Sequence, residues 1–339
     1  MTDKAGGRHT NVAIFVPHAG CPHCCSFCNQ RSISGQSKMP LPEDVHAACK
    51  TAVATMHSAS ANSQIAFFGG SFTAIPRETM IPLLEAAAYY VKSGYFGGIR
   101  ISTRPDAVDQ DILRILGEYS VRAVELGAQS MDSRVLVANN RGHTPEDVKN
   151  AAYMIHNAGL ELGLQMMTGL YKSSQTADYD TALSLAELRP KTMRIYPTLV
   201  MKNTVLDKLY REGEYTPPSL DETVSLCARL LLLFERDLGI RVIRLGLHAG
   251  SEMQSGLVEG PWHPAFRELC EGLIFYEKAR ELLKRDISGT RRVVLGVNPR
   301  SISRMKGHKR RNISLLHKDG YDVTVVGDPF VKEYEITIK

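Results

Sequence analysis

The chain has 339 residues and a net charge of +5, with 43% hydrophobic and 23% charged residues. These values are ordinary for a folded globular protein, and they exclude an extensively disordered chain. The length allows one large domain, or a large domain with a smaller one.

The sequence gives no sign of a membrane segment. No apolar run approaches the roughly 20 residues that a membrane helix requires. The N-terminus, Met1–Thr10, is polar and lacks the apolar stretch of a signal peptide. We therefore expect a cytoplasmic protein with no membrane partner.

Short apolar runs alternate with amphipathic stretches through most of the chain. The predicted strands are Val12–Val16, Ile65–Phe68, Ile99–Ser102, Ala123–Leu126, Leu160–Met167, Met193–Tyr196 and Arg241–Leu245. The predicted helices are Pro42–Met56, Glu78–Val91, Gln110–Glu118, Pro145–Ala158, Thr176–Leu188 and Leu220–Phe234. This alternation indicates βαβ units and a parallel sheet. We expect an α/β fold with a partial or complete (β/α) barrel, a doubly wound open sheet being the alternative.

Polar or glycine-rich segments directly follow five of the predicted strands. They are Pro17–Cys28, Gly69–Thr73, Thr103–Asp106, Gly127–Ser130 and Thr168–Leu170. In parallel α/β folds the C-terminal strand ends form the rim of the active site. We therefore expect the candidate chemistry to lie on one face of the sheet.

The rhythm of the chain changes after Gly246. A long helix is predicted at Ala265–Lys284 and a basic helical stretch at Ser301–Leu316. Strands are predicted at Arg292–Val297, Asp322–Val326 and Tyr334–Ile338. We expect two domains, a barrel over residues 1–248 and a small basic α/β subdomain over residues 249–339.

Four of the seven cysteines fall within eight residues, which points to metal or redox chemistry rather than to disulfides. Cys21, Cys25 and Cys28 form a Cys-x3-Cys-x2-Cys run just after a predicted strand. A loop this short can wrap three thiolates around one corner of a [4Fe–4S] cluster and leave one iron open. Because of Cys24, the ligand pairs Cys21-x2-Cys24 and Cys24-x3-Cys28 are also possible. A structural zinc site that uses Cys21, His23, Cys24 and another cysteine is one alternative, and redox thiols are the other.

The run Cys21–Cys28, with Phe27 before its last cysteine, resembles the signature of the radical S-adenosylmethionine (SAM) superfamily. Other segments resemble the radical SAM domain of the elongator catalytic subunit and, more distantly, the oxygen-independent coproporphyrinogen III oxidases. These segments lie within roughly residues 12–248 and are Phe68–Thr73, Ser102–Asp106, Val124–Ser130, Met166–Leu170 and Arg194–Thr198. Several ordered motifs are more specific than any one of them.

The resemblance implies a [4Fe–4S] cluster on Cys21, Cys25 and Cys28 that reduces SAM and releases a 5′-deoxyadenosyl radical. It also implies a set of SAM contacts. Glycine backbones approach the methionine moiety, amides bond the ribose, an arginine pairs with the carboxylate, and a ring lies beside the adenine. The residues at the matching positions are Phe27, Gly69, Gly70, Ser71, Thr103, Gln129, Arg141 and Gln165.

Two residues at the ends of later predicted strands are candidates for catalysis. Tyr196 and His248 can contact substrate or relay an electron or a proton, and a packed, hydrogen-bonded role is the alternative. The elongator protein continues into an acetyltransferase domain. The residues after His248 lack its glycine-rich loop, so acetyl-CoA chemistry is not expected here.

Positive charge is concentrated near the C-terminus. Between Lys284 and Lys318 there are eleven Lys and Arg residues and one acid, Asp286. This pattern suits a phosphate backbone, and a solvated face or an acidic partner is the alternative. The candidate nucleic-acid contacts are Arg300, Arg304, Lys306, Lys309, Arg310 and Arg311.

The leading functional hypothesis is a radical SAM enzyme that modifies an RNA, either tRNA or rRNA. A flavodoxin or ferredoxin would supply the electron. One alternative is radical chemistry on a small molecule such as a tetrapyrrole-like polycarboxylate. The other is a non-catalytic RNA-binding protein that contains zinc or a cluster.

Overall fold

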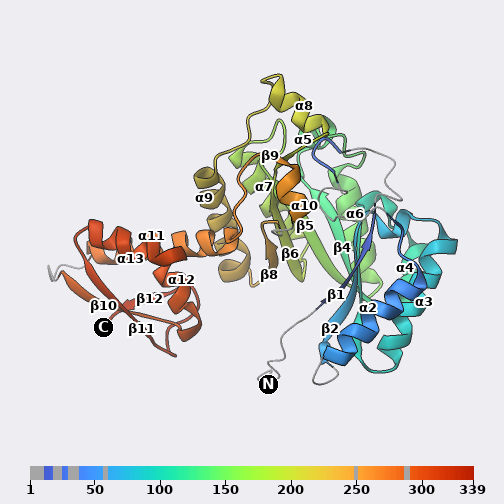
Figure 1. Cartoon of the computed structure of the whole chain (residues 1–339), viewed down its shortest axis with the longest axis horizontal. Helices are drawn as coiled ribbons and strands as arrows, with labels where there is room; N and C mark the ends of the chain where they lie inside the picture. The colour runs from blue at the N-terminus through green and yellow to red at the C-terminus, as the bar shows by residue number, and fades with distance from the viewer. Residues whose placement is uncertain (1–10, 18–24, 30–37, 56–59, 248–250, 286–290) are drawn as a thin grey trace.

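A seven-stranded parallel sheet forms the larger part of the molecule (Figure 1). The structure is a computed structural model that describes residues 11–17, 25–29, 38–55, 60–247, 251–285 and 291–339. The strand order is β1-β2-β3-β4-β5-β6-β8. Their bounds are β1 (Asn11–Val16), β2 (Ser60–Gly69), β3 (Phe96–Thr103), β4 (Val121–Gln129), β5 (Glu161–Thr168), β6 (Thr192–Pro197) and β8 (Arg241–Leu245). Because β1 and β8 are the two edges of this sheet, the predicted barrel is present in its partial form.

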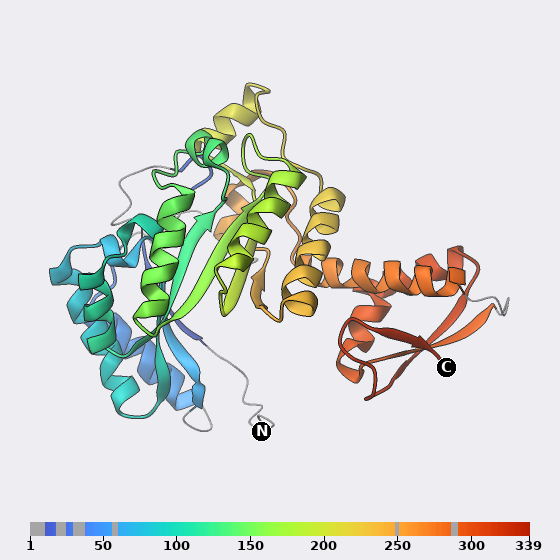
Figure 2. The same cartoon turned by 180° about the vertical axis from the view of Figure 1, so that it is seen from behind.

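The connections between these strands contain the helices that cover the outer face of the sheet (Figure 2). They are α2 (Pro42–Thr55), α3 (Arg77–Lys92), α4 (Gln110–Glu118), α6 (Pro145–Asn157), α7 (Gln175–Glu187) and α9 (Leu220–Leu231). The short α5 (Ser133–Ala138) and α8 (Val205–Arg211) belong to the same connections and lie at the top of the molecule in Figure 1. The chain continues from α9 as a π-helix, Leu232–Asp237. No helix in the described ranges is long and apolar enough to span a bilayer.

Local sequence signals explain where several helices begin. Thr144 and Asp147 form a capping box at the start of α6, with Pro145 in the first turn. Ser219 and Glu222 form a second capping box at the start of α9. Such caps satisfy backbone N–H groups that the first helical turn leaves without partners.

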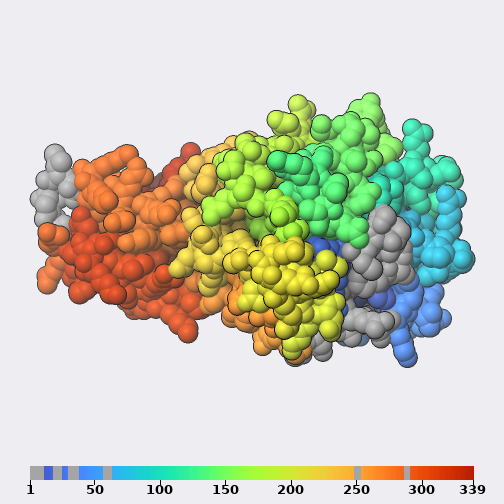
Figure 3. Space-filling model, turned by 90° about the horizontal axis from the view of Figure 1, so that it is seen from above, coloured from blue at the N-terminus to red at the C-terminus, as the bar shows by residue number. Residues whose placement is uncertain are grey.

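The C-terminal part of the chain forms a second, smaller sheet. The long helix α11 (Phe266–Arg285) is followed by the strands β10 (Arg292–Val297), β11 (Asp322–Gly327) and β12 (Ile336–Ile338). The short helices α12 (Ile302–Lys306) and α13 (Arg311–Lys318) lie between β10 and β11. The sheet order is β11-β10-β12, with one parallel and one antiparallel pair. Seen from above, this part forms a separate lobe at one end of an elongated molecule (Figure 3).

Helix α11 connects the two parts. Its N-terminal residues Phe266, Cys270 and Ile274 are buried in a hydrophobic core that both parts share. The short α10 (Ser251–Gly256) and β9 (Leu257–Glu259) precede it, and β9 pairs with β7 (Val200–Met201) beside the larger sheet. Residues 251–274 therefore contact the barrel, and the division at residue 248 stays a prediction.

The structure confirms the predicted parallel α/β fold with a C-terminal subdomain, and it corrects two predicted elements. The basic stretch Ser301–Leu316 is not one helix, because Gly307 has a φ of 75° and separates α12 from α13. The last strand does not start at Tyr334, which has a φ of 59° and a buried side chain. A positive φ is incompatible with both regular helix and strand.

Candidate functional site

The loop after β1 carries two of the three predicted cluster cysteines. Both Cys25 and Cys28 have partly accessible side chains. The Ser26 side chain between them donates to Asn139 Oδ1 at 2.7 Å, and its backbone N–H donates to Asn139 O at 3.1 Å. Cys21 lies outside the described residues. Within the described residues no group of three metal-ligating side chains comes together.

An arginine from the far side of the site reaches the loop. Arg141 Nη1 donates to Cys25 Sγ at 3.2 Å, and Nη2 donates to Gly127 O at 2.6 Å. The guanidinium therefore joins the cysteine loop to the end of β4. A cation at this place suits a sulfur that carries negative charge as a metal ligand.

A cavity of about 410 Å³ opens beside the cysteine loop, inside the curve of the sheet. A volume in this range suits a cofactor or a small ligand. Six of the residues singled out from the sequence line it: Phe27, Cys28, Gly69, Gln129, Gln165 and Tyr196. They come from five segments of the chain that are far apart in sequence, and the fold brings them to one place.

The backbone at the ends of β2 and β4 has conformations that ordinary strands do not adopt. Gly69 has a φ of 113°, and a Cβ atom there would lie 2.6 Å from Val16 O. Gly70 N donates to the same oxygen at 2.6 Å. Gln129 has a φ of 64° although it is not glycine. Backbone strain of this kind is concentrated at functional sites.

Several buried polar atoms near the cavity have no partner in the described part of the chain. They are Gln129 Oε1, Arg141 Nε, His143 Nδ1 and Thr198 Oγ1. Buried polar atoms are almost always hydrogen-bonded. Among these atoms, Gln129 Oε1 gives the strongest indication of a ligand, because Gln129 lines the cavity and its backbone is held in the left-handed region. The residues present therefore fit a polar ligand at this position.

The remaining predicted SAM contacts lie close to the cavity without lining it. Ser71 is buried after β2. Thr103 Oγ1 lies 2.6 Å from Thr73 Oγ1 in a buried hydroxyl pair. Because successive strand side chains alternate between faces, Ser102 lines the cavity in place of Thr103. His248 lies outside the described residues.

A buried ion network beneath the cavity was not predicted. Glu125 on β4 is 1% exposed and accepts from Arg100 at 3.2 Å and from Arg194 at 2.6 Å. Gln165 Nε2 donates to Glu125 Oε2 at 3.3 Å, and Arg194 Nη1 lies 3.4 Å from Tyr196 Oη. The network therefore fixes Gln165 and Tyr196 at the floor of the cavity.

The predicted nucleic-acid residues divide into two groups. Arg300, Lys309, Arg310 and Arg311 are exposed, and Lys306 is partly exposed. Arg304 instead pairs with Glu271 at 3.1 Å and with Glu333 at 3.9 Å, so its charge is engaged within the protein. Lys309 and Arg310 both have positive φ, which forms a tight basic turn just before α13.

The partial barrel and the cysteine loop beside its cavity define the class of enzymes that use a SAM-bound iron–sulfur cluster. Two family models match the sequence. The radical SAM superfamily model matches residues 15–177, and the radical SAM C-terminal domain model matches residues 190–273. The chain belongs to the radical SAM superfamily and is an enzyme of that superfamily. Its members typically use a [4Fe–4S] cluster and SAM.

Curated relatives place the chain near the elongator proteins. It is 30% identical over 222 residues to an uncharacterized protein of Methanocaldococcus jannaschii, with 64% of this chain and 65% of the relative covered. It is 29% identical over 213 residues to elongator complex protein 3 of Danio rerio, with 54% and 39% covered. It is 32% identical over 123 residues to a tRNA uridine(34) acetyltransferase of Dehalococcoides mccartyi, with 35% and 27% covered. The chain therefore spans less than two thirds of each of these relatives.

A solved structure shows the same fold. The archaeal Methanocaldococcus infernus Elp3 with an N-terminal deletion superposes with a TM-score of 0.62 at 18% sequence identity. The match covers 79% of this chain and 68% of that chain. It extends the shared architecture beyond the barrel strands.

Proposed function

We propose that this enzyme binds a [4Fe–4S] cluster through Cys21, Cys25 and Cys28, cleaves SAM, and modifies an RNA. The observation that carries the proposal is the convergence of Phe27, Cys28, Gly69 and Gln129 on one cavity. The unpartnered Gln129 Oε1 adds a polar group that a bound ligand would satisfy. When bound, the cluster and SAM supply a one-electron cleavage that yields a carbon-centred radical.

The residues of the chain have separate roles in this proposal. Gln129 accepts a hydrogen bond from a ribose hydroxyl through its unpartnered oxygen. Arg141 holds the Cys25 sulfur and leaves Nε for a carboxylate. Phe27 packs against a group of buried hydrophobic side chains that includes Val200 and Leu206. This packing holds its ring at the cavity wall. The largely apolar lining limits solvent access, which restricts side reactions of a reactive intermediate.

Two observations support RNA as the substrate. The relatives include a tRNA uridine(34) acetyltransferase, although the chain spans 27% of it. The exposed Lys309, Arg310 and Arg311 form a basic turn on the C-terminal lobe. A turn with three cations that pair with no acid among the described residues suits phosphate contacts, which are largely electrostatic. The barrel would then supply the chemistry and the lobe would bind the backbone.

Anaerobic reconstitution tests the cluster and the SAM reaction. The protein is incubated with iron and sulfide, then with SAM and a reductant, and 5′-deoxyadenosine is measured. We expect Cys25→Ala and Cys28→Ala to lose both the iron–sulfur absorbance and the product. Cys49→Ala is the matched control, because Cys49 is fully buried in the core and burial raises its pKa to about 12. Wild-type protein that yields no 5′-deoxyadenosine contradicts the proposal.

Mass spectrometry of cellular RNA with and without the gene tests the substrate. We expect one modified nucleoside to be missing in the deletion strain and to return with the wild-type gene. The Cys28→Ala gene should not restore it. Identical nucleoside profiles in all strains would remove RNA modification and leave the SAM chemistry standing.

A further inference from the structure

The inner face of the barrel carries more positive than negative charge. Arg100, Arg194 and Arg244 all lie on strands of the large sheet, and Arg194 and Arg244 are Cα partners on β6 and β8. Arg100 and Arg194 share one carboxylate, Glu125. Arg194 also lies over the Phe68 ring, 4.8 Å from its centroid. Two of the three guanidinium groups therefore have a counterion inside the protein.

Arg244 has no such counterion among the described residues. Its Nε donates to Gly246 O at 2.9 Å, and no carboxylate pairs with its guanidinium. Burial lowers the pKa of Arg244 from its usual value, and the neighbouring Arg194 adds to this effect while Tyr196 opposes it. A partly buried cation without a counterion is costly. An anionic ligand would remove that cost.

Arg244 lies where two cavities meet. It lines the 410 Å³ cavity of the candidate SAM site and also a wider one of about 770 Å³. Ala13, Phe68 and Arg194 are likewise shared by both. The wider cavity extends between the edge strands β1 and β8, where Arg241 lines it. A ligand that enters between these edges therefore passes Arg244 before it reaches the reaction cavity.

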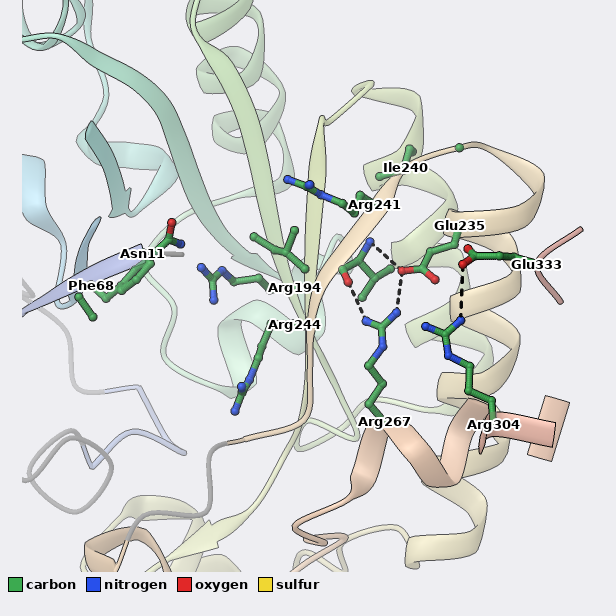
Figure 4. A pocket seen from close by; sticks show the side chains of 14 residues that line it. Asn11, Phe68, Arg194, Glu235, Ile240, Arg241, Arg244, Arg267, Arg304 and Glu333 are labelled. Atoms are coloured by element: carbon green, nitrogen blue, oxygen red, sulfur yellow. Dashed lines mark hydrogen bonds and ion pairs between the residues drawn. The ribbon is translucent and has the colours of Figure 1, made fainter. Parts of the chain in front are cut away.

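Two other arginines of the wider cavity are neutralised, and a third, Arg241, is exposed to solvent. Arg267 pairs with Glu235 at 2.8 Å and with Glu271 at 2.8 Å, and Arg304 pairs with Glu271 and Glu333. Figure 4 shows Arg267 joined to Glu235 and Arg304 joined to Glu333 by dashed lines, whereas Arg194 extends toward Phe68 and Arg244 lies apart from these pairs. The partly buried charge without a counterion is therefore located at the junction.

We propose that Arg244 binds an oxyanion of the substrate, a phosphate or a carboxylate, as the substrate enters the barrel between β1 and β8. The guanidinium fork suits either group, because both accept two parallel hydrogen bonds. This site gives the substrate a fixed orientation relative to the cofactor cavity. The assignment of the bound anion as a substrate rests on the proposed function. The binding of the anion does not.

Arginine footprinting measures how fast each arginine side chain reacts and whether an added anion protects it. The protein is treated with phenylglyoxal, and peptides are mapped by mass spectrometry with inorganic phosphate, AMP, acetate or malonate as the added probe. We expect Arg244 to react faster than the buried, paired Arg100 and to be protected by an oxyanion. Arg122, an exposed arginine on the same sheet, should react without protection. Protection by phosphate and AMP alone assigns a phosphate, and protection by acetate or malonate alone assigns a carboxylate.

The proposal is overturned if no probe protects Arg244, or if Arg244 reacts no faster than Arg100. Substitutions give a second measurement that does not depend on the reagent. Titration calorimetry with the protecting anion should show binding roughly 10- to 100-fold weaker in Arg244→Gln. Arg244→Lys should be intermediate because it keeps the charge but not the fork. Arg122→Gln should bind as the wild type does.

Cleavage of SAM without substrate separates this proposal from the preceding one. All three variants should retain the iron–sulfur absorbance, and Arg122→Gln should also form 5′-deoxyadenosine as the wild type does. If Arg244→Gln keeps the cluster but loses this cleavage, Arg244 serves SAM itself and the oxyanion site is wrong. Wild-type protein that binds the anion but forms no 5′-deoxyadenosine removes the proposed function alone.

Discussion

Glu125 is the one carboxylate that two buried arginines share at the floor of the reaction cavity. Arg100 is 2% exposed and Glu125 is 1% exposed, so water cannot replace either partner. Arg100 also pairs with Glu161 at 3.6 Å, and its Nε donates to Gln64 Oε1 at 2.8 Å. Arg194 depends on Glu125 for its carboxylate contact. Loss of the Glu125 carboxylate would therefore leave Arg194 on β6 without this counterion.

The first prediction concerns this carboxylate. Glu125→Gln should lower the free energy of unfolding by about 3–5 kcal/mol, because it leaves a buried guanidinium without its counterion. Glu118→Gln is the control, since Glu118 is 54% exposed and pairs with Arg114 on the surface of α4. That change should cost about 0.5 kcal/mol or less. Denaturant unfolding measures both, and equal losses would contradict the role of Glu125.

His143 is a buried imidazole beside the site. Its Nε2 lies 3.1 Å from Ala128 O. Burial, together with the neighbouring Arg141 cation, lowers the pKa of His143 to about 4. In the unfolded chain the His143 imidazole takes up a proton near pH 6.5, whereas in the folded chain it stays neutral until about pH 4. The neutral form is therefore the one that the fold stabilises.

The second prediction follows from the lowered pKa of His143 in the folded protein. Between pH 6.5 and 4 the unfolded state holds more protons at this position, so acid should destabilise the fold by about 3 kcal/mol through His143. His143→Gln removes that contribution and keeps a donor for Ala128 O. Burial raises the pKa of Asp178 to about 6, so this carboxyl stabilises the fold as the pH falls. Because Asp178 is present in both the wild type and His143→Gln, its contribution cancels in the comparison. Urea unfolding across this pH range should give a shallower loss in the variant, and parallel curves would refute the assignment.

The break between α12 and α13 decides where the basic turn lies. Gly307 has a φ of 75° and a ψ of 164°, and a Cβ atom there would lie 2.8 Å from the Asn312 side chain. Asn312 is buried and its Nδ2 donates to Gly272 O at 2.7 Å and to Met305 O at 3.0 Å. The turn is thereby fastened to α11, and Lys309 and Arg310 are left exposed.

The third prediction tests this break. Gly307→Ala should cost about 3 kcal/mol or more, because backbone strain and a contact with Asn312 add together. Gly213→Ala is a matched control, since Gly213 has a φ of 77° with open space around its Cβ position. It should cost about 1–2 kcal/mol from strain alone. Thermal unfolding distinguishes the two, and a smaller loss at Gly307 would contradict the packing described.

The large elements could be predicted from the sequence because their patterns are long. All seven strands of the parallel sheet were expected within a few residues of where they lie. β7 and β9 were not expected, since two or three residues carry no periodicity. The single basic helix was wrong because the chain breaks at Gly307, where the positive φ and the close approach of Asn312 depend on tertiary packing that the sequence pattern does not show.

The candidate site could be predicted only where motifs mark it. Phe27, Gly69 and Gln129 were found through the resemblance, and the structure places them around one cavity. Arg100, Glu125 and Arg244 were missed, because one charged residue in an apolar run gives no indication of its partner. A signal was available, since charged residues are unexpected in strands of a parallel sheet that is covered on its outer face. Which of them pair depends on the register between strands.

At the scale of the whole molecule, the charge asymmetry leads to the fourth prediction. Replacing Lys309, Arg310 and Arg311 by Ala should weaken RNA binding and lower the slope of log affinity against log salt by roughly 2–3, since each lost phosphate contact contributes roughly 0.7–0.9. Fluorescence anisotropy with a labelled tRNA at several salt concentrations measures the slope. Replacing Lys92, Arg114 and Lys149 on the barrel helices is the control. Equal slopes for both triple variants would argue against the basic turn.

Helix α11 has a mechanical consequence for the whole enzyme. Its 20 residues give it a length of roughly 30 Å. Arg267 in its first turn lines the wider cavity, while Gly272 holds the basic turn through Asn312. Because both contacts belong to the same helix, any movement of α11 on binding of a polyanion at the lobe would also displace the cavity wall. Such a movement would link the occupancy of the two places, and each ligand would then change the affinity for the other by the same factor.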